Sequence, residues 1–364
     1  MFANRDALPL VMMAATSWLQ AAMSGLKANG RRGLLVDDEV WALLESEQTA
    51  RHLQARLKLC RDRGIANILV THRLSDLRTL ADAIRLDGDE RREAWVASLP
   101  AAVARLERAW SVDVGAPFQP GGQTAWVAPA RTASGDDVVL KLAWWHPEAD
   151  REAAGLGVWD GDGAIRVYAS DRFDGTVALL VERCVPGTPL MSRSEREQDT
   201  VIATLLQRLW RDPPPGHRFR PLQQMCDAWA DEFEQQTAVR PVDLDPGLVR
   251  DGIILFRTLP ATTERHVLLC TDLHAGNVLA AEREPWLMID PKPHVGDPHY
   301  DVVQHLLNCD ERLHADPRGL ARRMADLAGL DRDRLLLWLF ARCVQQSPDW
   351  PAPLTDIARR IAPT

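Results

Sequence analysis

Residues 268–301, LLCTDLHAGNVLAAEREPWLMIDPKPHVGDPHYD, carry the polar groups that decide the fold. Asp272 and Asn277 stand five positions apart in a polar loop that follows an apolar run. A second apolar run leads to Asp290, and Pro291 ends that strand. Transfer of a γ-phosphoryl group needs a carboxylate to deprotonate the attacking hydroxyl and oxygen ligands to hold Mg²⁺. The pattern therefore predicts Asp272 as the catalytic base, with Asn277 and Asp290 as metal ligands.

A polar hairpin loop is the alternative interpretation, because D-x-x-x-x-N is common by chance. The pattern G-D-P-x-x-D, which ends at Asp301, follows Asp290 and favours the functional interpretation.

This stretch resembles the catalytic core of the aminoglycoside phosphotransferases, most closely the streptomycin 6-kinase and hydroxyurea phosphotransferase branch. That branch reads H-G-D-L-H-x-G-N-V-L and then I-D-P-K-x-x-x-G-D-P-x-x-D, and here Cys270 and Thr271 replace the usual His and Gly. We expect this exchange to affect loop rigidity more than the chemistry. The resemblance covers residues 88–364 and implies an α+β fold of the two-lobed protein-kinase-like type. It also implies that Asp301 ties down the catalytic loop.

Lysine is scarce in this chain, since only Lys27, Lys58, Lys141 and Lys292 occur among 43 basic residues. A lysine in the apolar run VVLKL would be costly to bury without an anionic partner. We therefore expect Lys141 to contact the α- and β-phosphates of ATP. The family pattern pairs this lysine with Glu152, and Glu148 is the second choice. A surface edge strand with a solvated lysine is the structural alternative.

Two further segments are candidates for nucleotide contacts. Backbone amides at the adjacent Gly121 and Gly122 would approach phosphates closely, although a plain hairpin turn is the alternative. The resemblance places the adenine-binding hinge at Glu182 and Cys184, where backbone groups would hold the base.

Residues 1–87 have a different character. Strands at 34–36 and 65–70, separated by a helical pattern, predict a parallel βαβ unit. Residues 30–84 resemble the Walker B half of conjugation and type IV secretion ATPases, with Asp38 and Glu39 at the D-E position. The chain has no G-x-x-x-x-G-K-[ST], however, so nothing there would cradle a triphosphate. We interpret the domains as a truncated ATPase-like fragment (or a small α/β cap) at 1–87, an N-terminal kinase-like lobe at 88–185 and a mainly helical catalytic lobe at 186–364.

Composition limits the classes of partner. A net charge of −8 argues against nucleic acid and is compatible with a cationic substrate. Six scattered cysteines indicate reduced thiols and a cytoplasmic location. The histidines lack metal-ligand spacing, and His305 is expected to have no cysteine partner nearby. The apolar stretch 7–23 favours a core helix over a signal peptide or membrane span.

The predicted function is ATP- and Mg²⁺-dependent O-phosphorylation of a small hydroxylated molecule. By resemblance the acceptor is a cationic aminoglycoside such as streptomycin, which the reaction would inactivate. Hydroxyurea and an unrelated metabolite are alternative acceptors. The competing interpretations are a catalytically silent nucleotide-binding pseudoenzyme and an interaction module related to the secretion ATPases.

Overall fold

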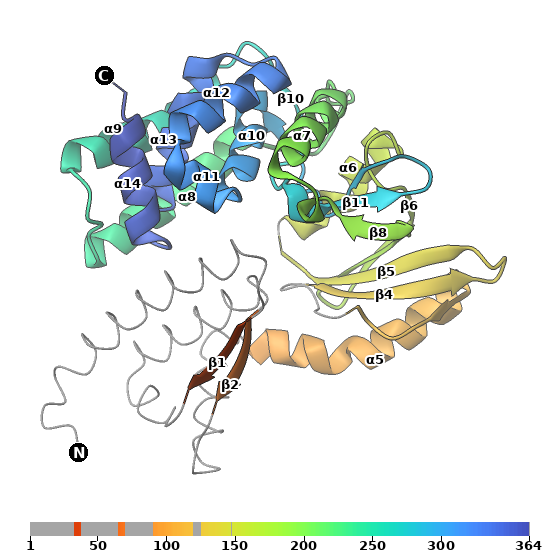
Figure 1. Cartoon of the computed structure of the whole chain (residues 1–364). Coiled ribbons are helices and arrows are strands. Elements are labelled where there is room, and N and C mark those ends of the chain that lie inside the picture. The colour runs from red at the N-terminus through yellow and green to blue at the C-terminus, as the bar shows by residue number, and fades with distance from the viewer. Residues whose placement is uncertain (1–32, 38–64, 70–89, 119–124, 147, 364) are drawn as a thin grey trace, which may run out of the picture. The chain divides into compact units, whose positions relative to one another are not determined.

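The computed structural model describes residues 33–37, 65–69, 90–118, 125–146 and 148–363 (Figure 1). The chain forms two compact units, Met1–Leu99 and Pro100–Thr364. Several predicted features lie outside the described residues, namely Asp38, Glu39, Gly121, Gly122 and the apolar stretch 7–23. None of the helices in the described ranges combines the length and apolar character needed to cross a membrane.

The first unit contains two short strands, β1 (Gly33–Asp37) and β2 (Ile65–Leu69). They pair in parallel, with Gly33 opposite Ile65 and Asp37 opposite Leu69. The predicted parallel pairing of these strands is therefore confirmed. Helix α5 (Glu90–Trp110) begins in this unit and ends in the second one.

The second unit opens with a five-stranded antiparallel sheet in the order β3-β4-β5-β7-β6. Its strands are β3 (Val112–Val114), β4 (Ala125–Thr132), β5 (Asp137–Trp144), β6 (Val167–Phe173) and β7 (Thr176–Glu182). Strand β5 lies at the centre and alternates in burial, as expected for a strand whose two faces differ. Leu140 and Leu142 are fully buried on one face, so Lys141 points to the other.

A short helical segment follows the sheet's central hairpin. The 3-10 turn η1 (Ala149–Arg151) leads into α6 (Glu152–Trp159), so Glu152 is the first residue of the helix. The indole nitrogen of Trp159 donates to the Leu209 carbonyl oxygen at 2.9 Å, which joins α6 to the helical lobe. Gly155 lies so close to Pro293 that a Cβ atom there would be only 2.3 Å from the proline ring.

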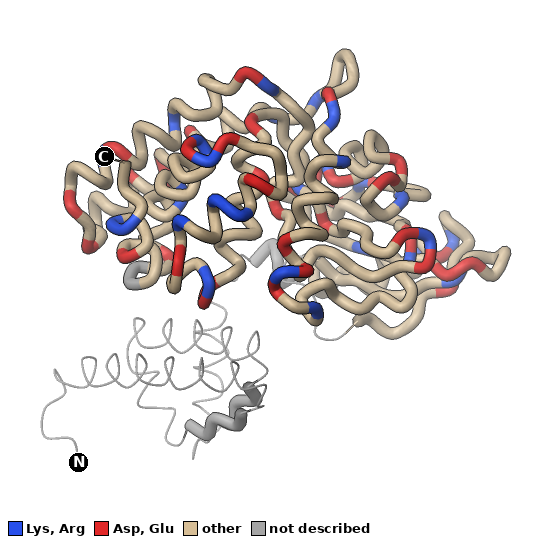
Figure 2. Tube along the Cα trace, turned by 45° about the horizontal axis from the view of Figure 1, so that its top comes forward, with Lys and Arg blue, Asp and Glu red and all other residues tan. Residues whose placement is uncertain are grey.

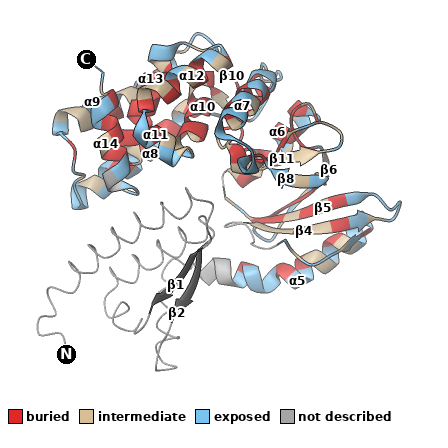
Figure 3. Ribbon diagram, in the orientation of Figure 1, coloured by how far each residue is buried: buried red, intermediate tan, exposed pale blue. Residues whose placement is uncertain are grey.

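The rest of the unit is mainly helical. Its helices are α7 (Glu195–Leu209), α8 (Leu222–Val239), α9 (Pro246–Thr258), α10 (Pro298–Leu307), α11 (Asp310–Ala315), α12 (Pro317–Ala328), α13 (Arg332–Gln345) and α14 (Pro351–Ile361). Asp-Pro pairs begin α9, α10 and α12: the aspartate caps backbone N–H groups and the proline fits the first turn. Helix α13 is the buried central helix of this helical region, and it packs against α9, α10, α12 and α14 (Figure 3).

Two small sheets connect the helical lobe to the site. One pairs β11 (Val278–Ala281) with β12 (Leu287–Met288) and with β8 (Pro186–Pro189). The other contains β10 (Val267–Leu269), β13 (His294–Gly296) and β9 (Arg220–Pro221). The stretch 268–301 that the sequence marks as catalytic starts in β10, includes β13 and ends in α10. The pairing of β10 with β13 therefore brings the two sides of the catalytic loop together.

Candidate functional site

The candidate catalytic loop begins where the buried strand β10 ends. Asp301, which is fully buried on α10, accepts hydrogen bonds from the backbone nitrogens of Cys270 at 2.9 Å and Thr271 at 2.6 Å. Trp210 donates its indole N–H to the same carboxylate at 3.1 Å. Burial raises the pKa of Asp301 to about 6, although these hydrogen bonds oppose the rise. Asp301 thus ties the start of the loop to α10.

Both carboxylate oxygens of Asp272 have donors. The Gln304 side-chain amide donates to Oδ1 at 2.9 Å, and the Lys292 ammonium donates to Oδ2 at 2.6 Å. Asn277 donates its side-chain amide to the Asp272 carbonyl oxygen at 3.0 Å, which leaves the amide oxygen as the atom available to a metal ion. Sequence reasoning assigned no role to Gln304 or Lys292. The scarcity of lysine could have pointed to Lys292, which is one of four lysines in the chain, whereas no feature of the sequence marked Gln304.

Asp290 lies beyond β12 with a φ of 54°, in the left-handed region. Its Oδ1 is 2.5 Å from the Lys141 ammonium, although 149 residues separate the two in sequence. Its side chain remains 46% exposed, so the carboxylate is open to a further ligand. Burial would raise the pKa of Asp290, but the Lys141 charge and hydrogen bond bring it below its ordinary value.

Lys141 also bonds both oxygens of Glu152, at 2.7 Å each. Of the two predicted partners, the structure brings Glu152, and not Glu148, into this contact. Burial raises the pKa of Glu152 to about 7, with a further contribution from the Asp290 charge and opposition from Lys141. Burial would lower the pKa of Lys141, yet the two carboxylates raise it well above its ordinary value. When Glu152 is ionised, the three groups carry one positive and two negative charges, which favours an additional cation.

The predicted hinge connects the two lobes. The Arg283 guanidinium, from the segment after β11, donates to both oxygens of Glu182 at 2.8 Å each. It also donates to the Ala164 carbonyl oxygen at 3.0 Å. Because the Glu182 side chain is engaged in this way, only its backbone marks the predicted adenine position. Burial raises the pKa of the neighbouring Cys184 thiol to about 11.

One arginine pairs with three acidic residues of α8. Arg257 approaches Asp231 at 2.6 Å, Glu234 at 3.2 Å and Asp227 at 3.9 Å. Acidic and basic stretches are interleaved along the described trace (Figure 2).

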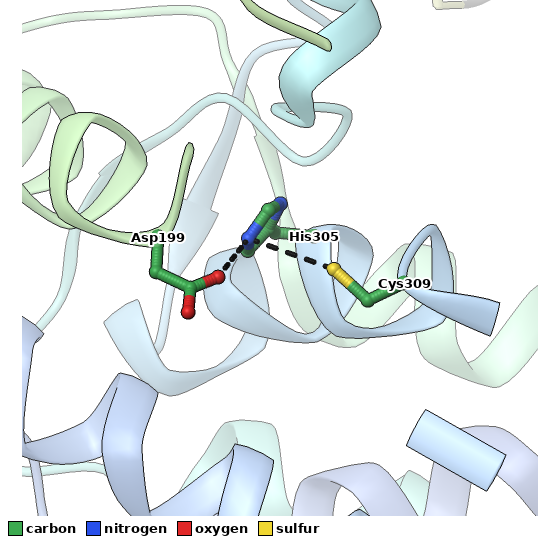
Figure 4. A group of neighbouring side chains, drawn as sticks. All are labelled: Asp199, His305 and Cys309. Carbon is green, nitrogen blue, oxygen red and sulfur yellow. Dashed lines mark hydrogen bonds and ion pairs between the residues drawn. The ribbon is translucent and has the colours of Figure 1, made fainter. Parts of the chain in front are cut away.

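A second cluster has ligand-like geometry. Asp199 on α7, His305 on α10 and Cys309 place their side-chain donor atoms within 4.8 Å of one another (Figure 4). His305 Nε2 lies 3.1 Å from Asp199 Oδ1 and 3.7 Å from Cys309 Sγ. The expectation that His305 has no cysteine nearby is therefore wrong. Cys309 follows His305 by four residues, about one helical turn, and this spacing brings the two side chains together at the C-terminal end of α10.

Charge argues against a metal ion in this cluster. Arg312 donates twice to Asp199, at 2.9 Å each, and Arg323 donates once at 2.8 Å. Burial would lower the pKa of His305, but its bond to Asp199 raises it to about 9, so the ring is an imidazolium near neutral pH. Three cationic groups already surround one buried carboxylate. The cluster is an ion-pair hub that joins α7 to α10, α11 and α12.

Comparison with known proteins identifies the family of this chain. Residues 110–352 match the family described as aminoglycoside/hydroxyurea antibiotic resistance kinase. The chain belongs to this family. A streptomycin 6-kinase of Streptomyces griseus is 35% identical over 277 residues, which are 74% of this chain and 88% of that protein. A hydroxyurea phosphotransferase of Kitasatospora aureofaciens is 36% identical over 266 residues, 72% of this chain and 76% of that protein.

A solved structure shows the same fold at low identity. Choline kinase LicA from Streptococcus pneumoniae superposes with a TM-score of 0.51 at 14% identity, covering 73% of this chain and 97% of that one. Membership in the antibiotic resistance kinase family confirms the predicted α+β, two-lobed protein-kinase-like fold. The chain is thus a phosphotransferase whose acceptor is a hydroxyl group. The family match lies inside the unit that holds Lys141, Asp272 and Asp290.

Proposed function

We propose that this kinase transfers the γ-phosphoryl group of ATP to a hydroxyl group of streptomycin or a closely similar aminoglycoside, and so inactivates it. The observation that carries the proposal is the 2.5 Å contact between Lys141 and Asp290, which brings the first lobe to the end of the catalytic stretch. It places a phosphate-binding cation beside a carboxylate suited to Mg²⁺. The streptomycin 6-kinase at 35% identity supports the choice of acceptor.

The residues present fit Mg²⁺. This ion prefers hard oxygen ligands, and Asp290 and Asn277 offer a carboxylate and an amide oxygen. The excess negative charge of Lys141, Glu152 and Asp290 taken together also favours a cation there. When bound, the ion would neutralise charge on the phosphates of the nucleotide.

Each side chain has a distinct part in the proposed reaction. Asp272 accepts the proton of the acceptor hydroxyl, and its two donors, Lys292 and Gln304, fix the plane of its carboxylate. Lys141 contacts the α- and β-phosphates while Glu152 holds its ammonium in place. Backbone groups at the hinge near Glu182 and Cys184 bind adenine, and we assign phosphate contacts to Gly121 and Gly122, which lie outside the described residues. Positioning and charge neutralisation supply most of the rate.

Hydroxyurea is the second candidate acceptor, because the hydroxyurea phosphotransferase is 36% identical over most of its length. A silent pseudoenzyme is disfavoured by the geometry: despite Cys270 and Thr271, Asp301 still holds both backbone nitrogens of the loop. We further propose that the kinase acts in the cytoplasm on a small cationic molecule, without nucleic acid or membrane partners.

The test is phosphate transfer from γ-labelled ATP with Mg²⁺ to streptomycin and, separately, to hydroxyurea. We expect streptomycin to gain one phosphoryl group by mass spectrometry, and Asp272→Ala to lower the rate by about 10²–10⁴-fold. Labelling of hydroxyurea alone would favour the second candidate. ATP binding without transfer to either would indicate another acceptor or the nucleotide-binding pseudoenzyme, and no ATP binding would refute the proposed kinase activity.

A further inference from the structure

Thr271 combines a strained backbone with a hydrogen bond from its side-chain hydroxyl. Its φ of 50° lies in the left-handed region, where a β-branched residue is a genuine outlier. Its hydroxyl donates to the Lys292 carbonyl oxygen at 2.5 Å, and the residue is buried. Strain of this kind persists where the surroundings over-determine it, often at functional sites. A glycine would relieve the strain but could not donate this bond.

This bond is one of two that fix the main chain of Lys292, and we call the pair of bonds the Lys292 brace. The Lys292 backbone nitrogen donates to the Cys270 carbonyl oxygen at 2.9 Å, so both sides of the residue are tied to the segment before Asp272. His294 Nδ1 lies 3.0 Å from the same Lys292 carbonyl oxygen and gives it a second partner. From this fixed main chain the Lys292 ammonium reaches Asp272 Oδ2 at 2.6 Å. Thr271 and Asp272 are neighbours in sequence, and Lys292 links them a second time through space.

We propose that Thr271 is a positioning residue for phosphoryl transfer: its hydroxyl fixes the Lys292 main chain, so that the Lys292 ammonium holds the Asp272 carboxylate toward the acceptor. The inference rests on the proposed role of Asp272 as the base. In this proposal Thr271 acts through Lys292.

Three substitutions separate the hydroxyl from the shape of the side chain. Thr271→Ser keeps the hydroxyl, Thr271→Val keeps the branched shape without it, and Thr271→Gly removes both the hydroxyl and the strain. We expect kcat to fall about tenfold or more in the Val and Gly variants, because small displacements of a catalytic group are costly. The Ser variant should keep a rate close to that of the parent, and KM for ATP should not change. A Val variant with the parental kcat would overturn the proposal.

A double-mutant cycle tests whether Thr271 acts through Lys292. Thr271→Val should cause no further loss of kcat in a Lys292→Met background, because the group that it positions is already absent. Independent, additive losses would contradict the proposed route. Thermal midpoints of all variants, measured alongside, show whether a loss of rate is only a loss of fold.

A readout without substrate keeps the inference separate from the proposed function. The chain has only four lysines, so nitrogen-15 spectra of their ammonium groups should be resolvable, with Lys292→Met providing the assignment. The Lys292 signal should have the shift of a bound ammonium in the parent and the Ser variant, and should move toward that of a free lysine in the Val variant. An unchanged Lys292 signal in the Val variant would refute the inference. If the Lys292 signal moves in the Val variant but the parent protein phosphorylates no acceptor, the positioning of Lys292 by Thr271 is supported and the proposed function is refuted.

Discussion

The Lys141 ammonium lies 2.5 Å from Asp290 and 2.7 Å from Glu152, so one cation serves two carboxylates from different parts of the chain. Glu152 is buried with its charge committed to Lys141, whereas the Asp290 side chain remains half-exposed. The two carboxylates therefore differ in their access to a further ligand. In the proposed reaction Glu152 fixes the lysine and Asp290 is a metal ligand.

Asp290→Asn should raise the Mg²⁺ concentration needed for half-maximal activity several-fold and lower kcat. The reason is that an anionic oxygen is lost from the shell of a hard cation. Activity against Mg²⁺ concentration measures the effect. Asp174→Asn is the matched control, because Asp174 also has a left-handed backbone, with a φ of 46°, but lies in an exposed turn. If both variants give the parental Mg²⁺ titration, Asp290 is not a metal ligand.

Arg283→Met should lower the free energy of unfolding by about 2 kcal/mol, because it leaves Glu182 without its two charge-assisted donors. Both side chains are mostly shielded from solvent, at 24% and 12% exposure. Urea unfolding followed by tryptophan fluorescence gives the value. The control is Arg131→Met, which breaks an exposed pair with Asp137 and should cost about 1 kcal/mol or less. Equal effects in the two variants would show that the hinge contact adds no special stability.

His305 should make stability depend on pH above neutrality. Its pKa is about 9 in the folded protein and 6.5 ordinarily. The folded state thus binds the proton more tightly, so the stabilisation is complete below about pH 6.5 and is lost as pH rises through 9. The full difference corresponds to about 3 kcal/mol.

His305→Gln keeps a donor toward Asp199 but cannot titrate, so its thermal midpoint should change less than the parent's between pH 6 and pH 9. His314→Gln, at an exposed histidine, should behave like the parent. Parallel pH curves for the parent and the His305 variant would refute the assignment.

Deleting residues 1–87 should leave a protein that folds and phosphorylates at close to the full-length rate. Every proposed catalytic group lies in the unit Pro100–Thr364, and the cut leaves α5 whole because that helix begins at Glu90. Side-by-side rates and thermal midpoints provide the measurement. A truncated protein that is insoluble, or soluble and inactive, would show that the domain boundary is misplaced.

Local sequence was sufficient for the elements whose causes are local. The apolar run around Lys141 becomes a strand because alternate side chains, Leu140 and Leu142, are buried on one face. The five-residue spacing of Asp272 and Asn277 places both on one short loop, where the Asn277 amide reaches the Asp272 carbonyl oxygen. The parallel pairing of β1 and β2 also follows from two apolar strands joined by a long connection.

Only the tertiary structure decided which distant side chains meet. Sequence left Glu148 as a rival to Glu152, and only the structure shows that Glu152, the first residue of α6, reaches Lys141 on β5. Gln304 reaches Asp272 because α10 packs against the end of β10, a contact that no pattern within either segment encodes. In the same way His305 finds Asp199, 106 residues away, because α7 and α10 pack together. Periodicity reports which face of an element is buried, whereas the partner on that face depends on how the whole core closes.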